Sequence, residues 1–183
     1  MSAPTIEGGN KATAIIIALL AAFLAVVETA GKSAESEATA AHIAASDLWA
    51  FFQAKTIRQT MARTASEALA IMAPESGPKA EAAVRQIETW RTTIARWESE
   101  PDTQEGRKEL SARARAKEAE RDRYKAKNEM FELSSAALQL AIVLTSASIV
   151  TSMILLLYCG LGLGSVAVVL AMLGWFAPTL IHL

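Results

Sequence analysis

The stretch LSSAALQLAIVLTSASIVTSMILLLYCGLGLGSVAVVLAMLGWFAPTLIHL, residues 133–183, contains no Lys, Arg, Asp or Glu in 51 residues. A second uncharged run, ATAIIIALLAAFLAVV, lies between Lys11 and Glu28. Soluble proteins do not segregate charge in this way, and a helix needs about 20 apolar residues to cross a hydrocarbon core of about 30 Å. The sequence therefore predicts a short tail at residues 1–11 and three transmembrane helices at residues 12–30, 134–158 and 161–181.

A tight turn must join the last two predicted spans, because the uncharged run holds only two lengths of helix. We expect this turn near Tyr158, Cys159 and Gly160, where glycine residues can supply it. Alternatively, Gly160 and Gly164 form a small-xxx-small pair that brings two helices close together in lipid. The Ser and Thr residues between 146 and 152 favour a packing face over an ion path, because no charged residue accompanies them.

The segment ETAGKSAESEA, residues 28–38, marks the end of the first predicted span. Its Gly-Lys-Ser lacks the first glycine of a phosphate-binding loop, since Val26 occupies that position. The helical pattern continues past this segment, and an acid lies close to any cleavage point, so we interpret the first span as an uncleaved anchor. Cys159 is the single cysteine, so the chain holds no disulfide framework.

Residues 31–132 hold most of the charge of a chain with 18 basic and 19 acidic residues. Such an even balance lacks the basic footprint of a nucleic-acid binder, so we expect no nucleic-acid partner. Helix breakers gather at Pro74–Pro78 and Pro101–Gly106, and the alternation typical of strands is missing. The sequence therefore predicts an all-α protein whose charged domain has helices at about residues 31–73, 79–98 and 106–132.

Each helix of the charged domain has an apolar face. The face of the first helix consists of Ala50, Ala54, Ile57, Met61, Ala65, Ala68 and Met72. The second helix has a coiled-coil-like seam at alternating steps of three and four, made of Ala80, Ala83, Ile87, Trp90, Ile94 and Trp97. The third helix keeps a thin stripe of Leu110, Ala114, Tyr124 and Phe131. Because the first helix is about as long as the other two together, we predict an extramembrane antiparallel hairpin, with a compact three-helix bundle as the alternative.

Aromatic residues at two places are candidates for interaction. Trp49, Phe51 and Phe52 point in different directions around a helix, so one partner helix cannot bury all three. With Lys55 and Arg58 one or two turns further on, they resemble an interaction patch, and packing inside the hairpin is the alternative.

The second place is the narrow seam that holds Trp90 and Trp97, which indicates pairing with the first helix or contact with another copy. Since an alanine-rich hairpin buries little apolar surface, we expect a homo-oligomer.

Charged residues near the membrane boundary offer a weaker candidate site. Glu28 is expected at the interface, where it reaches water or pairs with Lys32 one turn later, and a proton or cation site is the alternative. His42 and His182 have no second ligand at metal-binding spacing, and no Ser, Cys and His arrangement suits nucleophilic chemistry. We therefore predict no catalytic, cofactor or metal site and no enzymatic activity.

The run NKATAIIIALLAAFLAVVETAGKSAESEATAAHIAASDLWAFFQAKTIRQT, Asn10–Thr60, resembles the opening of an uncharacterised bacterial family of small inner-membrane proteins, known as a domain of unknown function. The resemblance covers most of the chain, and ETAGKSAESEA and SDLWAFFQAKTIRQT are its specific part. It implies a bacterial three-span membrane protein and carries no activity, cofactor or site residue.

The basic residues near the span ends predict the orientation. Arg121, Arg123, Lys125 and Lys127 precede the second span, so we expect a multi-pass protein of the bacterial inner membrane with its charged domain in the cytoplasm. The function we expect is a membrane-anchored helical scaffold that associates with itself or holds an unidentified membrane or cytoplasmic protein. The alternative is a small oligomeric channel or transport component with Glu28 near one mouth.

Overall fold

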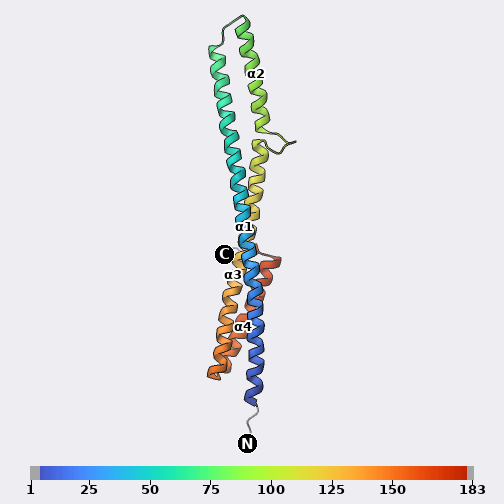
Figure 1. The fold of residues 1–183 in the computed structure, drawn as a ribbon, viewed down its shortest axis with the longest axis vertical. Coiled ribbons are helices and arrows are strands. Elements are labelled where there is room, and N and C mark those ends of the chain that lie inside the picture. The colour runs from blue at the N-terminus through green and yellow to red at the C-terminus, as the bar shows by residue number, and fades with distance from the viewer. Residues whose placement is uncertain (1–4, 181–183) are drawn as a thin grey trace. The chain divides into compact units, whose positions relative to one another are not determined.

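The computed structural model describes residues 5–180, and that part of the chain is all-α, without strands (Figure 1). Its helices are α1 (Thr5–Met72), α2 (Pro78–Glu98), α3 (Arg107–Thr151) and α4 (Ile154–Phe176). The helices α1, α3 and α4 are long and apolar enough to cross a membrane. The predicted tail at residues 1–11 is only partly described, and α1 already begins within it, at Thr5.

The chain divides into two compact units. Unit 1 combines α1 up to Thr39 with the chain from Glu120 onward, which includes most of α3 and all of α4. Unit 2 comprises Ala40–Ala119, which contains the rest of α1, all of α2 and the start of α3. Two helices, α1 and α3, therefore contribute residues to both units.

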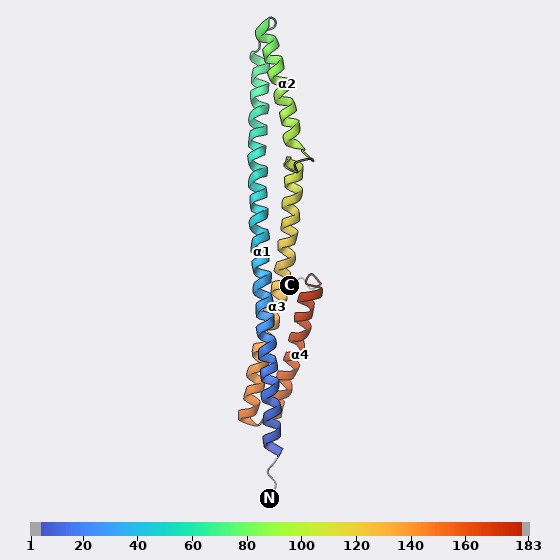
Figure 2. The same ribbon diagram turned by 45° about the vertical axis from the view of Figure 1, so that its right-hand side comes forward.

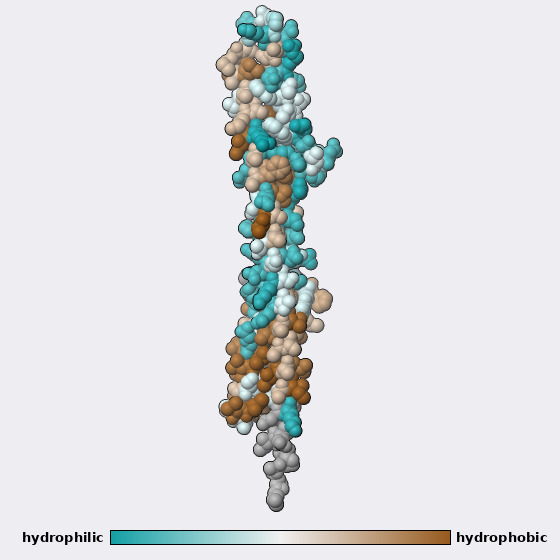
Figure 3. All heavy atoms as spheres, in the orientation of Figure 1, coloured by the Kyte–Doolittle hydropathy of each residue, from teal (hydrophilic) through white to brown (hydrophobic). Residues whose placement is uncertain are grey.

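The core of unit 1 is apolar and is built from all of its helices. Its buried members are Val27, Ala34, Phe131, Leu138, Ala167 and Ala171. Phe131 meets Trp175 edge to face, with ring centroids 5.2 Å apart. Large apolar side chains also cover the outside of this unit, where Val150 is 86% exposed and Phe176 is 83% exposed. In the view of Figure 3, apolar side chains gather over the start of α1 and the end of α3. Such a surface suits a lipid environment.

The turn between the last two apolar helices lies at Ser152 and Met153, so the predicted turn near Tyr158–Gly160 is wrong. Ser152 has the left-handed φ of 54° that reverses the chain. Gly160 lies inside α4 and is buried, and a Cβ there would stand 2.4 Å from Thr145 Oγ1 and 3.0 Å from the carbonyl oxygen of Ala141. The glycine is used for a close helix approach, the alternative that the sequence left open. Cys159 is consequently an exposed residue of α4.

Within unit 2, α2 and the start of α3 follow one another along the same helix, α1 (Figures 1 and 2). Gln59 on α1 donates to the carbonyl oxygen of Ile94 on α2, and Trp49 on α1 donates to Glu118 on α3. These contacts define an antiparallel hairpin whose return arm is made of two helices. The compact three-helix bundle would instead fold α3 back beside both of the other helices.

The face of α1 that packs in unit 2 differs from the predicted one. The predicted face is largely exposed, with Ile57 56%, Met61 67% and Met72 74% exposed. A run of buried or half-buried residues recurs at alternating steps of four and three and ends one residue beyond α1, and we call it the packed seam: Ala41, Ala45, Leu48, Phe52, Lys55, Gln59, Ala62, Ser66, Leu69 and Ala73. Two strongly polar residues in this seam hide its periodicity from a hydrophobicity-based reading.

The faces predicted for the other helices are the ones that pack. On α2, Ala83 is buried and the other seam residues are half-buried. On α3, Leu110, Ala114 and Phe131 are buried and Tyr124 is half-buried.

Candidate interaction site

Five polar residues lie where the end of α2 and the start of α3 pack on α1, and we call them the polar joint: Lys55, Gln59, Glu98, Glu100 and Arg107. Lys55 and Gln59 belong to the packed seam and are buried although they are polar, with exposed fractions of 6% and 5%. Burying such groups is costly unless they are paired and hydrogen-bonded. Lys55 and Gln59 therefore need partners that compensate for their burial.

Lys55 is held by the loop between α2 and α3. Its Nζ donates to the carbonyl oxygen of Glu105 and lies 3.7 Å from Glu100 Oε2 and 3.8 Å from Glu105 Oε2. The same ammonium lies 5.2 Å from the centroid of the Phe51 ring. Two carboxylates, a carbonyl and an aromatic face thus replace the water around this charge.

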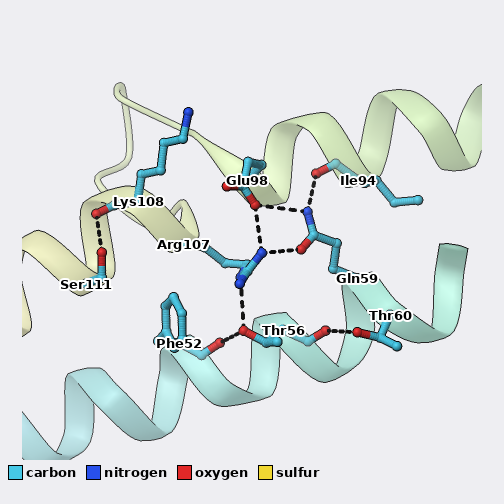
Figure 4. Close-up of polar contacts among 9 residues, drawn as sticks. All are labelled: Phe52, Thr56, Gln59, Thr60, Ile94, Glu98, Arg107, Lys108 and Ser111. Carbon is cyan, nitrogen blue, oxygen red and sulfur yellow. Dashed lines mark hydrogen bonds and ion pairs between the residues drawn. The ribbon is translucent and has the colours of Figure 1, made fainter.

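Arg107, the first residue of α3, ties three segments together (Figure 4). Its Nε donates to Thr56 Oγ1 at 2.9 Å, and its Nη1 donates to Gln59 Oε1 at 2.6 Å and to Glu98 Oε2 at 2.8 Å. The guanidinium also lies 5.0 Å from the centroid of the Phe52 ring. Gln59 Nε2 completes the network by donating to the carbonyl oxygen of Ile94 and to Glu98 Oε2, both at 3.2 Å. The planar fork of an arginine suits such a multiple contact.

The loop itself is held closed by Glu109 and Gly106. Glu109 accepts hydrogen bonds from Ser99 Oγ at 2.7 Å and from the backbone N–H of Glu100 at 3.1 Å. The Ser99 hydroxyl is the main reason why the pKa of Glu109 is lowered from its ordinary value of 4.5. A Cβ on Gly106 would lie 2.4 Å from the backbone nitrogen of Glu100 and 2.7 Å from Ser99 Cα, so only glycine fits here.

The contacts of the polar joint form two sets, one around Lys55 and one around Arg107. Among the described residues, every buried side-chain nitrogen or oxygen has a hydrogen-bond partner. The residues of the joint are therefore occupied with one another, and the arrangement can fix the register of α2 and α3 on α1. Among residues 11–180, whose side chains the structure describes, no group of His, Cys, Asp and Glu is placed to hold a metal ion, and His182 lies outside that range.

The predicted patch around Trp49 is divided between two sides of α1. Trp49 and Phe52 are half-buried, and their rings meet edge to face at 5.4 Å, while Trp49 Nε1 donates to Glu118 Oε1 at 2.9 Å. Lys55 is buried in the polar joint, and Phe51 and Arg58 are exposed. The structure therefore does not bring these five residues together as one outward patch.

Trp90 and Trp97 lie half-buried on the α2 seam. This seam faces α1 of the same chain, because the carbonyl of Ile94 within it accepts the hydrogen bond from Gln59. Pairing with the first helix, one of the two expected roles, thus accounts for these tryptophans.

Glu28 and Lys32 are exposed residues of α1 in unit 1. Both line an open cleft of about 380 Å³, together with polar residues of α3. Glu28 Oε1 accepts a hydrogen bond of 3.3 Å from Gln139 Nε2 on α3. Among the described residues no ion pair joins Glu28 to Lys32. Of the two expected roles, the exposed Glu28 therefore keeps the contact with water, and it also contacts α3.

The apolar face of α1 that was expected to be buried lies at the surface instead. We call it the α1 stripe: Ala50, Ala54, Ile57, Met61, Ala65, Ala68 and Met72. All of these side chains are exposed except Ala68, which is half-buried. At 3.6 residues per turn, the α1 stripe lies about 130° around the helix from the packed seam. In unit 2, α1 therefore carries an apolar face that its own chain leaves exposed, in addition to the packed seam that its own chain covers.

In its described part, the chain is all-helical and has three helices able to span a membrane. Its unit 2 is held together by the polar joint. The chain belongs to the family DUF4337, described as a domain of unknown function, whose match covers residues 9–177. The predicted resemblance to a domain of unknown function is thus confirmed, while a bacterial origin stays a prediction. No curated protein and no solved structure matches the chain.

Proposed function

We propose that this protein is a membrane-anchored helical scaffold without enzymatic activity. In this proposal α1, α3 and α4 cross the bilayer, and unit 2 lies outside it and presents a docking face. The observation that carries the proposal is the α1 stripe, because an apolar face that its own chain leaves exposed is typical of a surface that meets another protein. The exposed side of α2 differs, since it carries solvated ion pairs such as Arg85–Glu81 and Arg91–Glu88.

The proposed location is the inner membrane of a bacterium, with unit 2 in the cytoplasm. Support comes from the basic residues that precede the apolar part of α3, which favour the cytoplasmic side: Arg121, Arg123, Lys125 and Lys127. The Nζ of Lys127 lies 5.9 Å from the centroid of the Phe131 ring, so its charge sits at the start of the apolar segment.

A scaffold is preferred to a channel because of how the polar side chains of α3 and α4 are used. Thr145 and Ser148 donate to carbonyl oxygens of their own helix, each at 2.7 Å, and Ser134 donates to Ala167 across the core at 2.7 Å. Hydroxyl groups occupied in this way support helix packing. The feature that favours transport is the cleft beside Glu28.

Photocrosslinking in native membranes tests the scaffold proposal. A photoreactive residue replaces Ile57 on the α1 stripe of the full chain, and the matched control carries it at Arg85, which is exposed on α2. We expect protein adducts, with the same chain or another, from position 57 and few from position 85. Equal yields at the two positions, or none at either, would refute the scaffold.

A further inference from the structure

The α1 stripe has a spacing that specifies its partner. Its members follow steps of four, three, four, four, three and four, which is an 11-residue repeat. Such a repeat keeps the stripe on one face of a nearly straight helix, and the partner that fits it is another helix lying alongside. From Ala50 to Met72 the stripe is about 33 Å long, at 1.5 Å per residue.

We propose that the α1 stripe packs on the α1 stripe of a second copy of this chain, parallel and in register. This inference rests on the proposed membrane anchoring. Two copies inserted in one bilayer with the same orientation send α1 out of the membrane in the same direction, so identical residues stand at the same height. Ile57 then meets Ile57 of the other copy, and Met61 meets Met61.

The charges beside the stripe are compatible with this parallel arrangement. Arg58 flanks one side, and the side that it would face in the second copy carries Gln53 and Thr60, which offer an amide and a hydroxyl to the guanidinium. No like charges oppose each other between residues 50 and 72. Asp47 lies on the same face one turn earlier and would oppose the Asp47 of the second copy, so we expect the contact to begin at Ala50.

The size of the stripe indicates a weak and reversible contact. A strip about 33 Å long and about 10 Å wide is smaller than the roughly 800 Å² per partner of a standard stable interface. Membrane anchoring offsets this deficit, because it fixes the orientation of both copies and raises their local concentration. We therefore expect self-association in membranes that is lost when detergent separates the copies.

The test uses single cysteines in the full chain, with Cys159→Ser as the background. Met61→Cys and Ile57→Cys report on the stripe, and Arg85→Cys is the exposed control on α2. Native membranes are treated with a short thiol crosslinker, and the products are identified by mass spectrometry. We expect a homodimer several-fold more abundant for the two stripe positions than for the control. Met61→Glu placed in the Ile57→Cys protein should abolish the homodimer, whereas Met61→Leu should keep it.

Three results would overturn the inference. Equal homodimer yields for Met61→Cys and Arg85→Cys would mean random collision. Efficient crosslinking between Ile57→Cys in one copy and Met72→Cys in another, as strong as between identical positions, would contradict the parallel register. An adduct from position 61 with a different protein alone would refute self-pairing and leave the scaffold proposal standing. Unchanged helicity of the Met61→Glu chain by circular dichroism shows that it is folded.

Discussion

In unit 1 the buried polar side chains carry hydroxyls, whereas in unit 2 they are the ammonium of Lys55 and the amide of Gln59. Ser134 in unit 1 reaches the carbonyl of Ala167, while Lys55 in unit 2 is held by two carboxylates and a carbonyl. Helices in an apolar environment gain from close backbone approach. A hairpin of two helices buries little apolar area. Because a buried charge needs a specific partner, such charges can fix the register of the two arms.

The largest effect is expected from Gly106→Ala in unit 2. Its Cβ would collide with backbone atoms of Ser99 and Glu100, which cannot move without opening the joint. We expect a loss of about 3 kcal/mol in the stability of unit 2. This loss is measured by the rate of amide hydrogen exchange in α2 and the start of α3, with the full chain in lipid nanodiscs. Unchanged protection in these helices would show that the loop adapts.

The matching change in unit 1 is Gly160→Ala, which places a Cβ against Thr145 Oγ1 and the carbonyl of Ala141. Because a hydroxyl can give way more easily than backbone, we expect a loss of about 2 kcal/mol, seen as faster exchange in α4. Gly162→Ala is the control, since a Cβ there meets nothing within 4 Å. Alanine is the better helix former, so the control should be neutral or slightly stabilising. Equal losses in both variants would remove the close approach as the cause.

Removing the guanidinium of the polar joint should have a moderate effect. Arg107→Leu leaves the nearly buried Gln59 Oε1 without its 2.6 Å donor. We expect a loss of about 1–2 kcal/mol in thermal unfolding followed by tryptophan fluorescence. The neighbouring exposed residue gives the control variant, Lys108→Leu, which should change the melting temperature little. A loss as large in the control would point to helix propensity rather than to the network.

A smaller effect is expected on the stability of the protein at acid pH. The pKa of Glu109 is lowered chiefly by the Ser99 hydroxyl, so the folded state prefers the carboxylate. The resulting stability is present above the ordinary value of 4.5 and is lost as the pH falls through the lower pKa of the folded state.

Ser99→Ala should therefore be less stable than the wild type at neutral pH, and the difference should shrink as the pH falls below 4.5 and through the lowered pKa of Glu109 in the folded state. Urea unfolding at a series of pH values measures it. Ser111→Ala, which removes a hydroxyl bonded to the carbonyl of Lys108, should show a difference that does not depend on pH.

The smallest effect is expected from Glu28→Gln in unit 1. The amide oxygen of the new side chain still accepts the hydrogen bond from Gln139, so stability should change by less than about 0.5 kcal/mol. Ion flux through vesicles containing the full chain should also match that of the wild type. A changed flux would support the channel alternative in place of the scaffold.

Much of the fold follows from charge segregation and helix breakers, which predict the all-α class and the three long apolar helices. The turn at Ser152 could not be predicted in this way, because the nearby glycines look like a better turn, while Gly160 is in fact needed where α4 approaches α3. Glycine pattern alone does not distinguish these two uses.

The polar joint could not be predicted from periodicity, because Lys55 and Gln59 occupy seam positions that hydrophobic patterning assigns to solvent. The unbroken steps of four and three from Ala41 to Ala73 would have indicated the seam if small and polar residues had been counted with the apolar ones. The α2 seam was predictable because all of its members are apolar or small.

The loop between α2 and α3 is also a practical handle for engineering. Asp102 and Thr103 are exposed and lie outside both helices, while the bonds from Glu109 to Ser99 and Glu100 hold the loop ends together. Exposed loop tips of this kind tolerate added sequence. A short epitope placed between Asp102 and Thr103 would let an antibody report, in sealed vesicles, on which side of the membrane the loop resides.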